Sequence, residues 1–485
     1  MRRRQFIQGA GAVAAWLHLP RVLTAQAMEG QTQPTGIQPK PGEVALRVDT
    51  STPTHLVPAN YTGLSYESAQ LAHPLFFAAE NKGLIELVKR LSPAGVLRIG
   101  GNTSELTHWA GEGSGSTGAA VAEPPSAGKN TAESYTITST AIRNLRGFLD
   151  ATGWKLIYGL NLKNGTPEEA AAEAGFVAQT MGDKLLALQF GNEPDLFHHD
   201  DENHKRWTYE EYATKWLQFE PVVRAAAPKA VLAGPDVASN WGWVQKFAAQ
   251  MHDDVGMLTG HYYIGGPPSN PTMNLDALLT PPQHLLDEIA VIERLVTTSG
   301  LPYRMAEGNT CYNGGKPGVS DTFASALWAG DYMLQLAQAG YSGVNLHGGG
   351  EGWYTPIATD AAGVSSPRPV YFGMLLAQEF AGATMVETAL NSLGENVTGY
   401  AAVRGKDLLV AVFNKSAKKL QLRLDSGLKG NHRAAKVSML TAPSLDAKQD
   451  VKFELTGRVG KDPTVLPRSL LLAPYSGMLL QFVGV

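Results

Sequence analysis

The chain has very little cysteine: Cys311 is the single one in 485 residues. An intrachain disulfide is therefore impossible, and stability has to come from a buried core, for which this length is ample. A lone cysteine can act as a nucleophile, but that chemistry requires a positioned histidine base. We interpret Cys311 as a small apolar filler.

An excess of charge of one sign and long apolar segments are also absent. Lys and Arg total 40 against 44 Asp and Glu, which leaves a net charge of −4. A nucleic-acid-binding protein would be expected to carry a basic excess. Beyond the N-terminus no run reaches 18 uninterrupted apolar residues, the minimum for a membrane helix. We therefore expect neither nucleic acid nor membrane as a partner, and the oligomeric state is left open.

The N-terminus has the pattern of a targeting segment. Arg2, Arg3 and Arg4 precede a small, apolar stretch, Gly9–Leu19, and Ala25-Gln26-Ala27 offers a cleavage site. The arginines also resemble the bacterial twin-arginine signal, which carries folded proteins. We predict a signal peptide over 1–27, a Gln/Thr/Pro/Gly-rich linker over 28–43 and an exported protein, periplasmic or secreted. The alternative is a disordered basic terminus.

Short apolar runs then alternate with helical patterns. The expected strands are 61–66, 96–99, 155–160, 185–190, 231–233, 257–263, 303–306 and 343–346. Capping boxes at Thr166–Glu169 and Thr208–Glu211 start two of the expected helices. Eight strand–helix repeats predict an α/β fold, a (β/α)8 TIM barrel, over 60–378. The runner-up is an open doubly wound sheet, but the Gly-x-Gly-x-x-Gly pattern of a dinucleotide site does not follow the first strand.

Beyond residue 379 the pattern changes to short strands separated by turn residues, expected at 397–403, 408–414, 418–424, 435–440, 451–455 and 477–482. This predicts an additional C-terminal antiparallel β-sandwich domain over 379–485. The segment 44–59, with a strand at Val44–Val48, is expected to join this sheet. Gly111–Lys129, rich in Gly, Ser, Ala and Pro, follows the second barrel strand and is expected to be a long loop, either a lid or a disordered segment.

Two glutamates come directly after barrel strands. Glu193 follows the fourth strand in Gly191-Asn192-Glu193-Pro194, and Glu307 follows the seventh in Ala306-Glu307-Gly308. The carboxyl ends of barrel strands meet on one face. Cleavage of a glycosidic bond needs two carboxyl groups about that bond, one protonated and one ionised. We therefore predict that Glu193 and Glu307 are the catalytic pair of a glycoside hydrolase.

Longer motifs resemble glycoside hydrolase family 79, the β-glucuronidases and heparanases, within the clan of two-glutamate barrels. The matching stretches are Val96–Gly101, Gln189–Pro194, Leu232–Val237, His261–Tyr263, Glu307–Gly315 and Ser320–Ala324. The likeness covers roughly residues 45–485, and the chain is similar to the bacterial exo-acting enzymes of that family. It implies a retaining exo-β-glucuronidase without cofactor or metal, acting on carbohydrate that ends in glucuronic acid.

The resemblance also implies a role for each matching residue. Glu193 is the acid/base and Glu307 the nucleophile. The implied substrate-binding residues are Glu67 for distal hydroxyls, Asn102 as a sugar contact of differing residue type, Asn192 for the 2-hydroxyl, Tyr263 beside the nucleophile, and Tyr312, the Gly314 N–H and Tyr354 for the uronate carboxylate. Hydrogen bonds to an ionised acceptor are strong enough to hold a carboxylate without arginine.

Other polar groups are ambiguous. His198, His199 and His204 fit no zinc spacing, and we interpret them as part of a solvated loop. His347 could line the pocket or fill the top of the barrel. Asp195 and Asp236 also end strands and could support the catalytic pair.

Two competing functions remain open. One is another retaining activity on the same barrel: a β-glucosidase, a β-xylosidase or an endo-acting heparanase-like enzyme. We expect the last to line its cleft with basic clusters, which the motifs lack. The other is an inactive carbohydrate-binding protein, which would not need both glutamates.

Overall fold

The computed structural model describes residues 38–113, 134–200, 203–350, 352–425, 435–459 and 470–484. The predicted signal peptide, residues 28–37 of the predicted linker and most of the Gly111–Lys129 loop lie outside these residues. Pro39–Val485 forms one compact unit. Among the described residues, no helix combines the length and the apolar character needed to cross a membrane.

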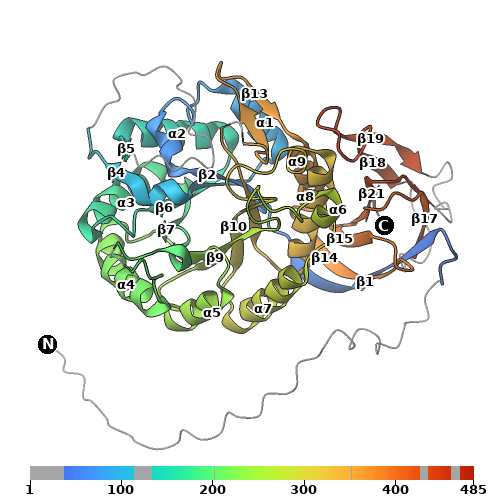
Figure 1. Cartoon of the computed structure of the whole chain (residues 1–485), viewed down its shortest axis with the longest axis horizontal. Coiled ribbons are helices and arrows are strands. Elements are labelled where there is room, and N and C mark those ends of the chain that lie inside the picture. The colour runs from blue at the N-terminus through green and yellow to red at the C-terminus, as the bar shows by residue number, and fades with distance from the viewer. Residues whose placement is uncertain are drawn as a thin grey trace, which may run out of the picture. The chain divides into compact units, whose positions relative to one another are not determined.

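A closed barrel of parallel strands forms the centre of this unit (Figure 1). Its strands are β2 (Thr62–Glu67), β3 (Val96–Gly100), β6 (Lys155–Leu160), β7 (Leu185–Phe190), β8 (Leu232–Val237), β9 (Met257–Tyr263), β10 (Tyr303–Asn309) and β11 (Gly343–His347). Each contains or overlaps one predicted apolar run, so the barrel prediction is confirmed. Strands buried on both faces read as continuous apolar runs, which is why the sequence located them.

Helices surround the barrel. They are α1 (Lys82–Leu91), α2 (Ser139–Thr152), α3 (Pro167–Met181), α4 (Tyr209–Ala226), α5 (Trp241–Gln250), α6 (Leu275–Leu278), α7 (Gln283–Ser299), α8 (Phe323–Gln338) and α9 (Pro369–Gln378). Both predicted capping boxes form: in the first, Thr166 accepts from the Glu169 N–H at 3.2 Å and the Glu169 carboxylate accepts from the Thr166 N–H at 3.2 Å. Two short ribbons, β4 with β5 (Thr107–Trp109, Tyr135–Ile137) and β12 with β13 (Ile357–Thr359, Ser365–Pro367), stand apart from the barrel sheet.

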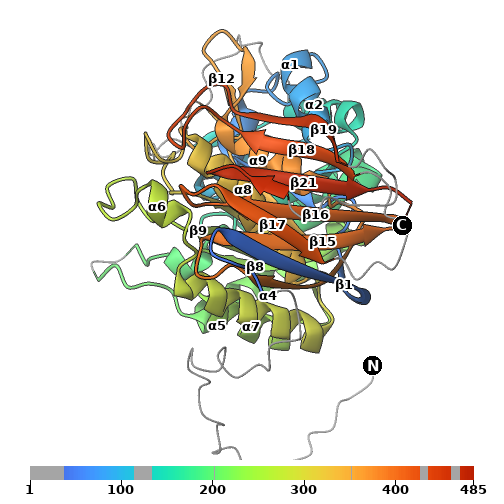
Figure 2. The same cartoon turned by 90° about the vertical axis from the view of Figure 1, so that its right-hand side faces the viewer.

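The C-terminal part is a nine-stranded sheet of order β19-β18-β21-β16-β15-β14-β1-β17-β20 (Figure 2). Its strands are β1 (Glu43–Leu56), β14 (Thr384–Asn391), β15 (Val397–Arg404), β16 (Asp407–Asn414), β17 (Leu420–Asp425), β18 (Ala435–Thr441), β19 (Lys452–Val459), β20 (Leu470–Leu472) and β21 (Ser476–Phe482). Apolar side chains of β17 and β20 share a buried cluster with those of β16 and β21, so the sheet folds over a core of its own.

One feature corrects the expectation of a purely antiparallel domain: β1 pairs with β17 in parallel, while it pairs with β14 antiparallel. Parallel neighbours need a long connection between them. Here the whole barrel lies between the two strands in the chain. The predicted strand Val44–Val48 falls inside β1, and β14 and β20 had no counterpart among the predicted strands.

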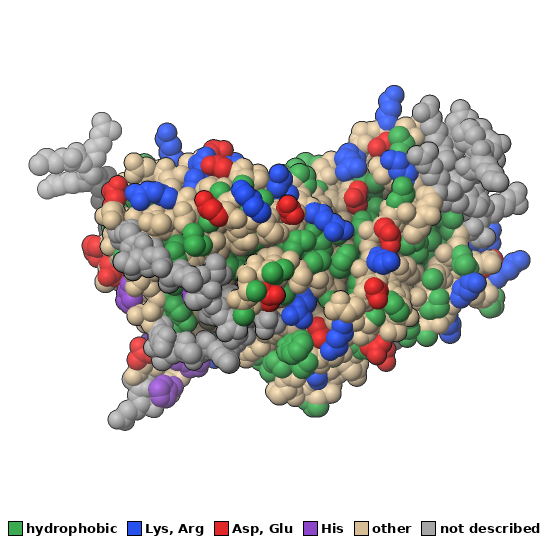
Figure 3. Space-filling model, turned by 90° about the horizontal axis from the view of Figure 1, so that it is seen from above, with side chains coloured by type: hydrophobic (Ala, Val, Ile, Leu, Met, Phe, Trp, Pro, Cys, Tyr) green, Lys and Arg blue, Asp and Glu red, His purple; other side chains and the backbone are tan. Residues whose placement is uncertain are grey.

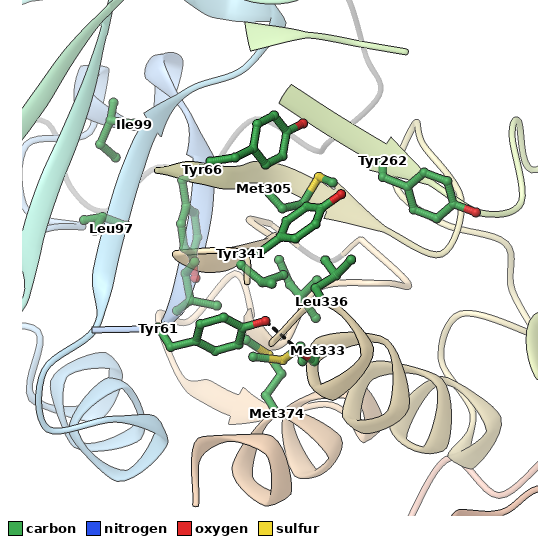
Figure 4. Packing of buried hydrophobic residues seen from close by; sticks show 14 of the residues in the cluster. Tyr61, Tyr66, Leu97, Ile99, Tyr262, Met305, Met333, Leu336, Tyr341 and Met374 are labelled. Atoms are coloured by element: carbon green, nitrogen blue, oxygen red, sulfur yellow. Dashed lines mark hydrogen bonds between the residues drawn. The ribbon is translucent and has the colours of Figure 1, made fainter. Parts of the chain in front are cut away.

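The sheet and the barrel share one core. Tyr400, Leu409 and Phe413 of the sheet belong to the same buried cluster as the residues of α8 and α9. These two helices pack so closely that a Cβ at Gly373 would lie 1.9 Å from the Ala326 carbonyl oxygen. On the other side of α8, the Tyr61 hydroxyl donates to the Met333 carbonyl at 2.6 Å (Figure 4). The barrel, the two helices and the sheet therefore pack as one body.

Charged side chains of both signs are interspersed over the face seen in Figure 3, without a broad region of one sign. Inside the protein, one ion pair joins α8 to the sheet. Lys415 Nζ lies 2.6 Å from Asp331 Oδ2, and both side chains are almost fully buried. The hydroxyls of Thr398 and Tyr400 donate to the other Asp331 oxygen at 2.6 and 2.7 Å.

Replacing Asp331 by Ala should destabilise the protein strongly, because it leaves the Lys415 ammonium buried without a partner. We expect a loss of about 3–5 kcal/mol in the free energy of unfolding, measured by urea denaturation. The control is Lys418→Ala, which removes an exposed pair with Glu395 and should cost less than about 1 kcal/mol. Equal effects of the two substitutions would contradict this assignment.

Candidate active site

A pocket of about 480 Å³ opens at the carboxyl ends of the barrel strands, and both Glu193 and Glu307 line it. A carboxylate oxygen of each lies within 4.8 Å of the other, and a ring nitrogen of His261 lies within the same distance of both. Retaining glycosidases place their two carboxyl groups about 5–5.5 Å apart, whereas inverting ones separate them by about 6.5–9.5 Å. The structure thus brings the two predicted residues together at one sugar-sized gap.

The backbone that presents Glu193 is held in an uncommon conformation. After β7 the chain turns at Gly191 (φ 81°), and Glu193 itself is left-handed with φ 51° and ψ 51°. Asp236, in the neighbouring strand β8, is also left-handed with φ 61°, and its carbonyl accepts from the Glu193 N–H at 2.9 Å. Non-glycine residues in this region cost of order 1–3 kcal/mol and concentrate at functional sites.

Glu105, in the turn after β3, holds the same loop in place through hydrogen bonds. Its buried carboxyl group accepts from the Asn192 N–H at 2.9 Å and from the N–H groups of Leu162 and Lys163 at 3.0 and 2.6 Å. Burial raises the pKa of Glu105 to about 7 against the opposing effect of these N–H groups. One side chain therefore connects the ends of β3, β6 and β7.

Arg98 of β3 stands at the centre of the site and is about 1% exposed. Its guanidinium donates to Glu307 Oε2 and Asp236 Oδ2, each at 2.5 Å, and to Asn192 Oδ1 at 2.8 Å. Gly100 lies two residues further on the same inward face. A Cβ there would lie 2.5 Å from the guanidinium carbon, so a larger residue would displace Arg98.

His261 of β9 links Glu193, which follows β7, to Asp236 of β8. Its Nδ1 lies 3.0 Å from Glu193 Oε1, and its Nε2 lies 3.2 Å from Asp236 Oδ2. Burial alone would lower the pKa of His261, but Asp236 and Glu307 raise it to about 10. His261 is therefore an imidazolium at neutral pH and donates to the Glu193 carboxyl group.

The two glutamates are driven toward opposite protonation states. Burial would raise the pKa of Glu307, but His347, His261 and Arg98 lower it to about 2. Tyr263 also donates to Glu307 Oε1 at 2.7 Å. Burial raises the pKa of Glu193, and the negative charge of Glu307 adds to the rise against His261. The pair can thus supply one nucleophilic carboxylate and one proton donor at the same gap.

Most of the predicted binding residues lie in the pocket. Those that line it are Glu67, Asn102, Tyr263, Tyr312 and Tyr354. Glu67 is held by the N–H and hydroxyl of Thr103 at 2.8 and 2.7 Å. Asn192 and Gly314 do not contribute to the lining: Asn192 is buried against Arg98, and Gly314 follows Asn313, which does line the pocket.

His347, whose place the sequence left open, lines the pocket between Glu67 and Glu307, with ring nitrogens 3.6 and 3.4 Å from their oxygens. Sequence reasoning assigned no role to Arg98, His261 or Glu105, and named Asp236 only as a possible supporting acid. Arg98 and His261 sit inside the quoted motifs. The available signal was a charged residue placed in an otherwise apolar barrel strand, since such groups are rarely buried without partners.

The positive charges around this constellation disfavour a metal ion. Glu193, His261 and Glu307 are close enough together to offer three ligand atoms. A histidine must be neutral to bind a metal, however, and the pKa of His261 is raised to about 10 by its carboxylate neighbours. Arg98 already supplies a second positive charge beside Glu307.

Comparisons with known proteins point the same way, although no family model matches the chain. It is 26% identical over 389 residues to a β-glucuronidase of Aspergillus niger, covering 72% of this chain and 68% of the relative. It is 28% identical over 228 residues to a β-glucuronidase of Neurospora crassa, covering 40% of each protein.

Solved structures share the whole fold. A 4-O-α-L-rhamnosyl-β-D-glucuronidase from Fusarium oxysporum superposes with a TM-score of 0.69 at 19% identity, covering 90% of this chain and 99% of that one. An α-L-arabinofuranosidase from Thermotoga maritima gives a TM-score of 0.67 at 17% identity, covering 90% and 99%. At these identities the likeness establishes the fold, a closed (β/α)8 barrel with a C-terminal β-domain.

Replacing Arg98 by Lys should raise the pKa of Glu307. Lysine keeps the positive charge, but a single ammonium cannot donate to Glu307, Asp236 and Asn192 with the geometry of the guanidinium fork. Carbon-13 NMR titration of the glutamate side chains should show Glu307 ionised down to the lowest pH at which the wild-type protein stays folded, and titrating at higher pH in the variant.

The matched control for that titration is Arg143→Lys, which alters a guanidinium 5.2 Å above the Phe176 ring on the outside of the barrel. It should leave the Glu307 titration unchanged. An unshifted Glu307 resonance in Arg98→Lys would show that Arg98 does not control its ionisation.

Proposed function

We propose that this protein is a retaining exo-β-glucuronidase that removes terminal β-linked glucuronic acid from glycans or glycoconjugates. The observation that carries the proposal is the pair Glu193 and Glu307, whose oxygens lie within 4.8 Å in one pocket and whose pKa values are displaced in opposite directions. The likeness to two β-glucuronidases supports the choice of substrate.

In the first step, Glu307 attacks the anomeric carbon while Glu193 donates its proton to the departing glycosidic oxygen. This breaks the glycosidic bond and leaves the sugar bonded to Glu307. In the second step, ionised Glu193 removes a proton from water, the water oxygen attacks the anomeric carbon, and Glu307 departs as a carboxylate. Arg98 and Tyr263 orient Glu307 through both steps, and His261 orients Glu193.

The uronate carboxylate is assigned to the side of the pocket formed by Tyr312, Asn313 and Tyr354. Two phenol hydroxyls and the Gly314 N–H would bind it, as the resemblance to family 79 implies. Glu67, held by Thr103, would accept hydrogen bonds from the hydroxyls at the far edge of the sugar. Export through the N-terminal signal belongs to the same proposal and rests on the sequence pattern alone.

An endo-acting, heparanase-like function is the second candidate. Enzymes acting on sulfated chains are expected to bring several basic side chains to the cleft. Among the described residues that line the pocket, Arg206 is the single Lys or Arg. This composition favours exo action on a less charged substrate.

The decisive experiment follows hydrolysis of an aryl β-glucuronide by proton NMR. Two successive displacements at the anomeric carbon restore the original configuration, so β-glucuronic acid should appear first and then equilibrate with the α-anomer. Initial release of the α-anomer would refute the retaining mechanism. Comparable turnover of the matching aryl glucoside would refute the uronate specificity.

Substitutions at the two glutamates should separate their roles. Glu307→Ala should abolish turnover of every substrate, because it removes the group that attacks the anomeric carbon. Glu193→Ala should lower turnover of natural glycosides by about 10²–10⁴-fold while sparing the first step on activated aryl glucuronides, whose leaving groups need no proton. The initial burst of the aryl product measures the first step, and the steady-state release of glucuronic acid measures the second. Equal losses on activated and natural substrates would contradict the acid role of Glu193, provided the variant unfolds at the wild-type temperature.

A further inference from the structure

The lining of the pocket divides into two halves around the catalytic pair. Barrel order places β10, β11, β2 and β3 on one side and β7, β8 and β9 on the other. The first half carries Glu67, Asn102, Tyr312 and Tyr354 of the residues assigned to the glucuronic acid. Asn192 and Tyr263, which are also assigned to it, lie beside the catalytic pair at the ends of β7 and β9. The rest of the second half has no role in that assignment, and its lining residues include Leu196, Ser239, Trp241, Tyr262, His284 and Glu288.

We propose that this second half is a leaving-group subsite for a neutral, polyhydroxylated sugar, and that Glu288 is its hydrogen-bonding residue. The proposal rests on the proposed function, because the leaving group is defined by the bond that Glu193 protonates. Glu193 follows β7 and therefore belongs to the same half of the barrel mouth as β8 and β9.

Glu288 is the strongest sign that a ligand belongs there. It lies on α7, it lines the pocket, and it is about 1% exposed. Neither of its carboxyl oxygens has a hydrogen-bond partner among the described residues. A buried polar group left without a partner costs about 1–3 kcal/mol, and such groups are rare in native proteins.

The surroundings of Glu288 suit hydroxyl groups. Trp241, at the start of α5, lies beside Glu288, and its buried indole N–H lowers the pKa of that carboxyl group without closing a hydrogen bond of normal geometry to it. His284 lies one helical turn before Glu288, on the same face of α7, and its Nε2 is 3.4 Å from the Tyr262 hydroxyl. Donors, acceptors and an indole ring are the groups that bind a sugar, which presents hydroxyls at its edge and C–H groups on its faces.

The charge at this place argues against an anionic leaving group. No Lys or Arg pairs with Glu288 among the described ion pairs, and burial raises its pKa to about 8, with only partial opposition from Trp241. An anionic sugar buried beside Glu288 would therefore have no cationic partner among the described residues there. Arg206 lines the pocket as well, but its side chain is exposed.

Glu288→Leu separates this subsite from the catalytic machinery. The substrates are 4-nitrophenyl β-glucuronide, whose leaving group has no sugar hydroxyls, and a disaccharide of glucuronic acid β-linked to a neutral hexose. We expect KM for the disaccharide to rise about tenfold, the effect of one lost hydrogen bond to a buried group, with the aryl substrate changed less than about twofold. Glu288→Gln should restore most of the affinity for the disaccharide, because an amide still forms hydrogen bonds with sugar hydroxyls.

A stability measurement distinguishes a binding residue from a structural one. Replacing an unpartnered buried carboxyl by an apolar side chain should raise Tm in Glu288→Leu, whereas a structural role would lower it. Glu293→Gln, exposed on the same helix, is the matched control and should change neither substrate. If Glu288→Leu fails to fold, the exposed His284→Ala should still raise KM for the disaccharide about threefold.

Equal changes on both substrates, or none on either, would overturn the subsite. Failure of the proposed function has a different signature: the wild-type protein would not hydrolyse the aryl glucuronide at all.

Discussion

The site depends on one buried cation placed between two carboxylates. The Arg98 guanidinium bridges Glu307 and Asp236, at 2.5 Å from each, and binds Asn192 with its remaining donors. That charge lowers the pKa of both carboxyl groups against the effect of burial, together with the neighbouring histidines. Because the guanidinium is planar and rigid, it also fixes where β3, β7, β8 and β10 end relative to one another. Arg98 thus contributes to both the charge and the geometry at the gap.

The division of labour between the glutamates follows from this arrangement. Glu307 has Arg98, His261 and His347 as positive neighbours, whereas Glu193 has His261 beside it and the charge of Glu307 across the gap. The pKa values of two chemically identical side chains are therefore displaced in opposite directions. Asp236 takes no part in the proposed reaction, yet it keeps both Arg98 and His261 charged and accepts the N–H of Glu193.

The sequence predicted the parts of the fold and of the site that leave a periodic pattern or a short motif in the chain. The barrel strands were found because buried strands read as apolar runs, and Glu193 and Glu307 because each directly follows such a run. β14 mixes apolar with charged and polar residues, and β20 spans only Leu470–Leu472, so neither gave a clear pattern. The parallel pairing of β1 with β17 joins ends of the chain that no local pattern connects. Arg98 and His261 were within the quoted motifs, but their partners lie on other strands, and only the folded barrel reveals the network.

The position of β1 has a consequence for how the molecule is made. This strand is synthesised before any part of the barrel, yet both of its neighbours, β14 and β17, come after the barrel is complete. During translation its backbone N–H and C=O groups have no partner strand until more than three hundred further residues, from the end of β1 to the start of β14, have been added. Pairings so distant in sequence form slowly, and an unpaired strand edge invites association with other chains. We expect the nascent protein to require protection from aggregation until its last strands emerge, and removal of the β-sheet to leave a barrel with an orphaned N-terminal strand rather than an independent enzyme.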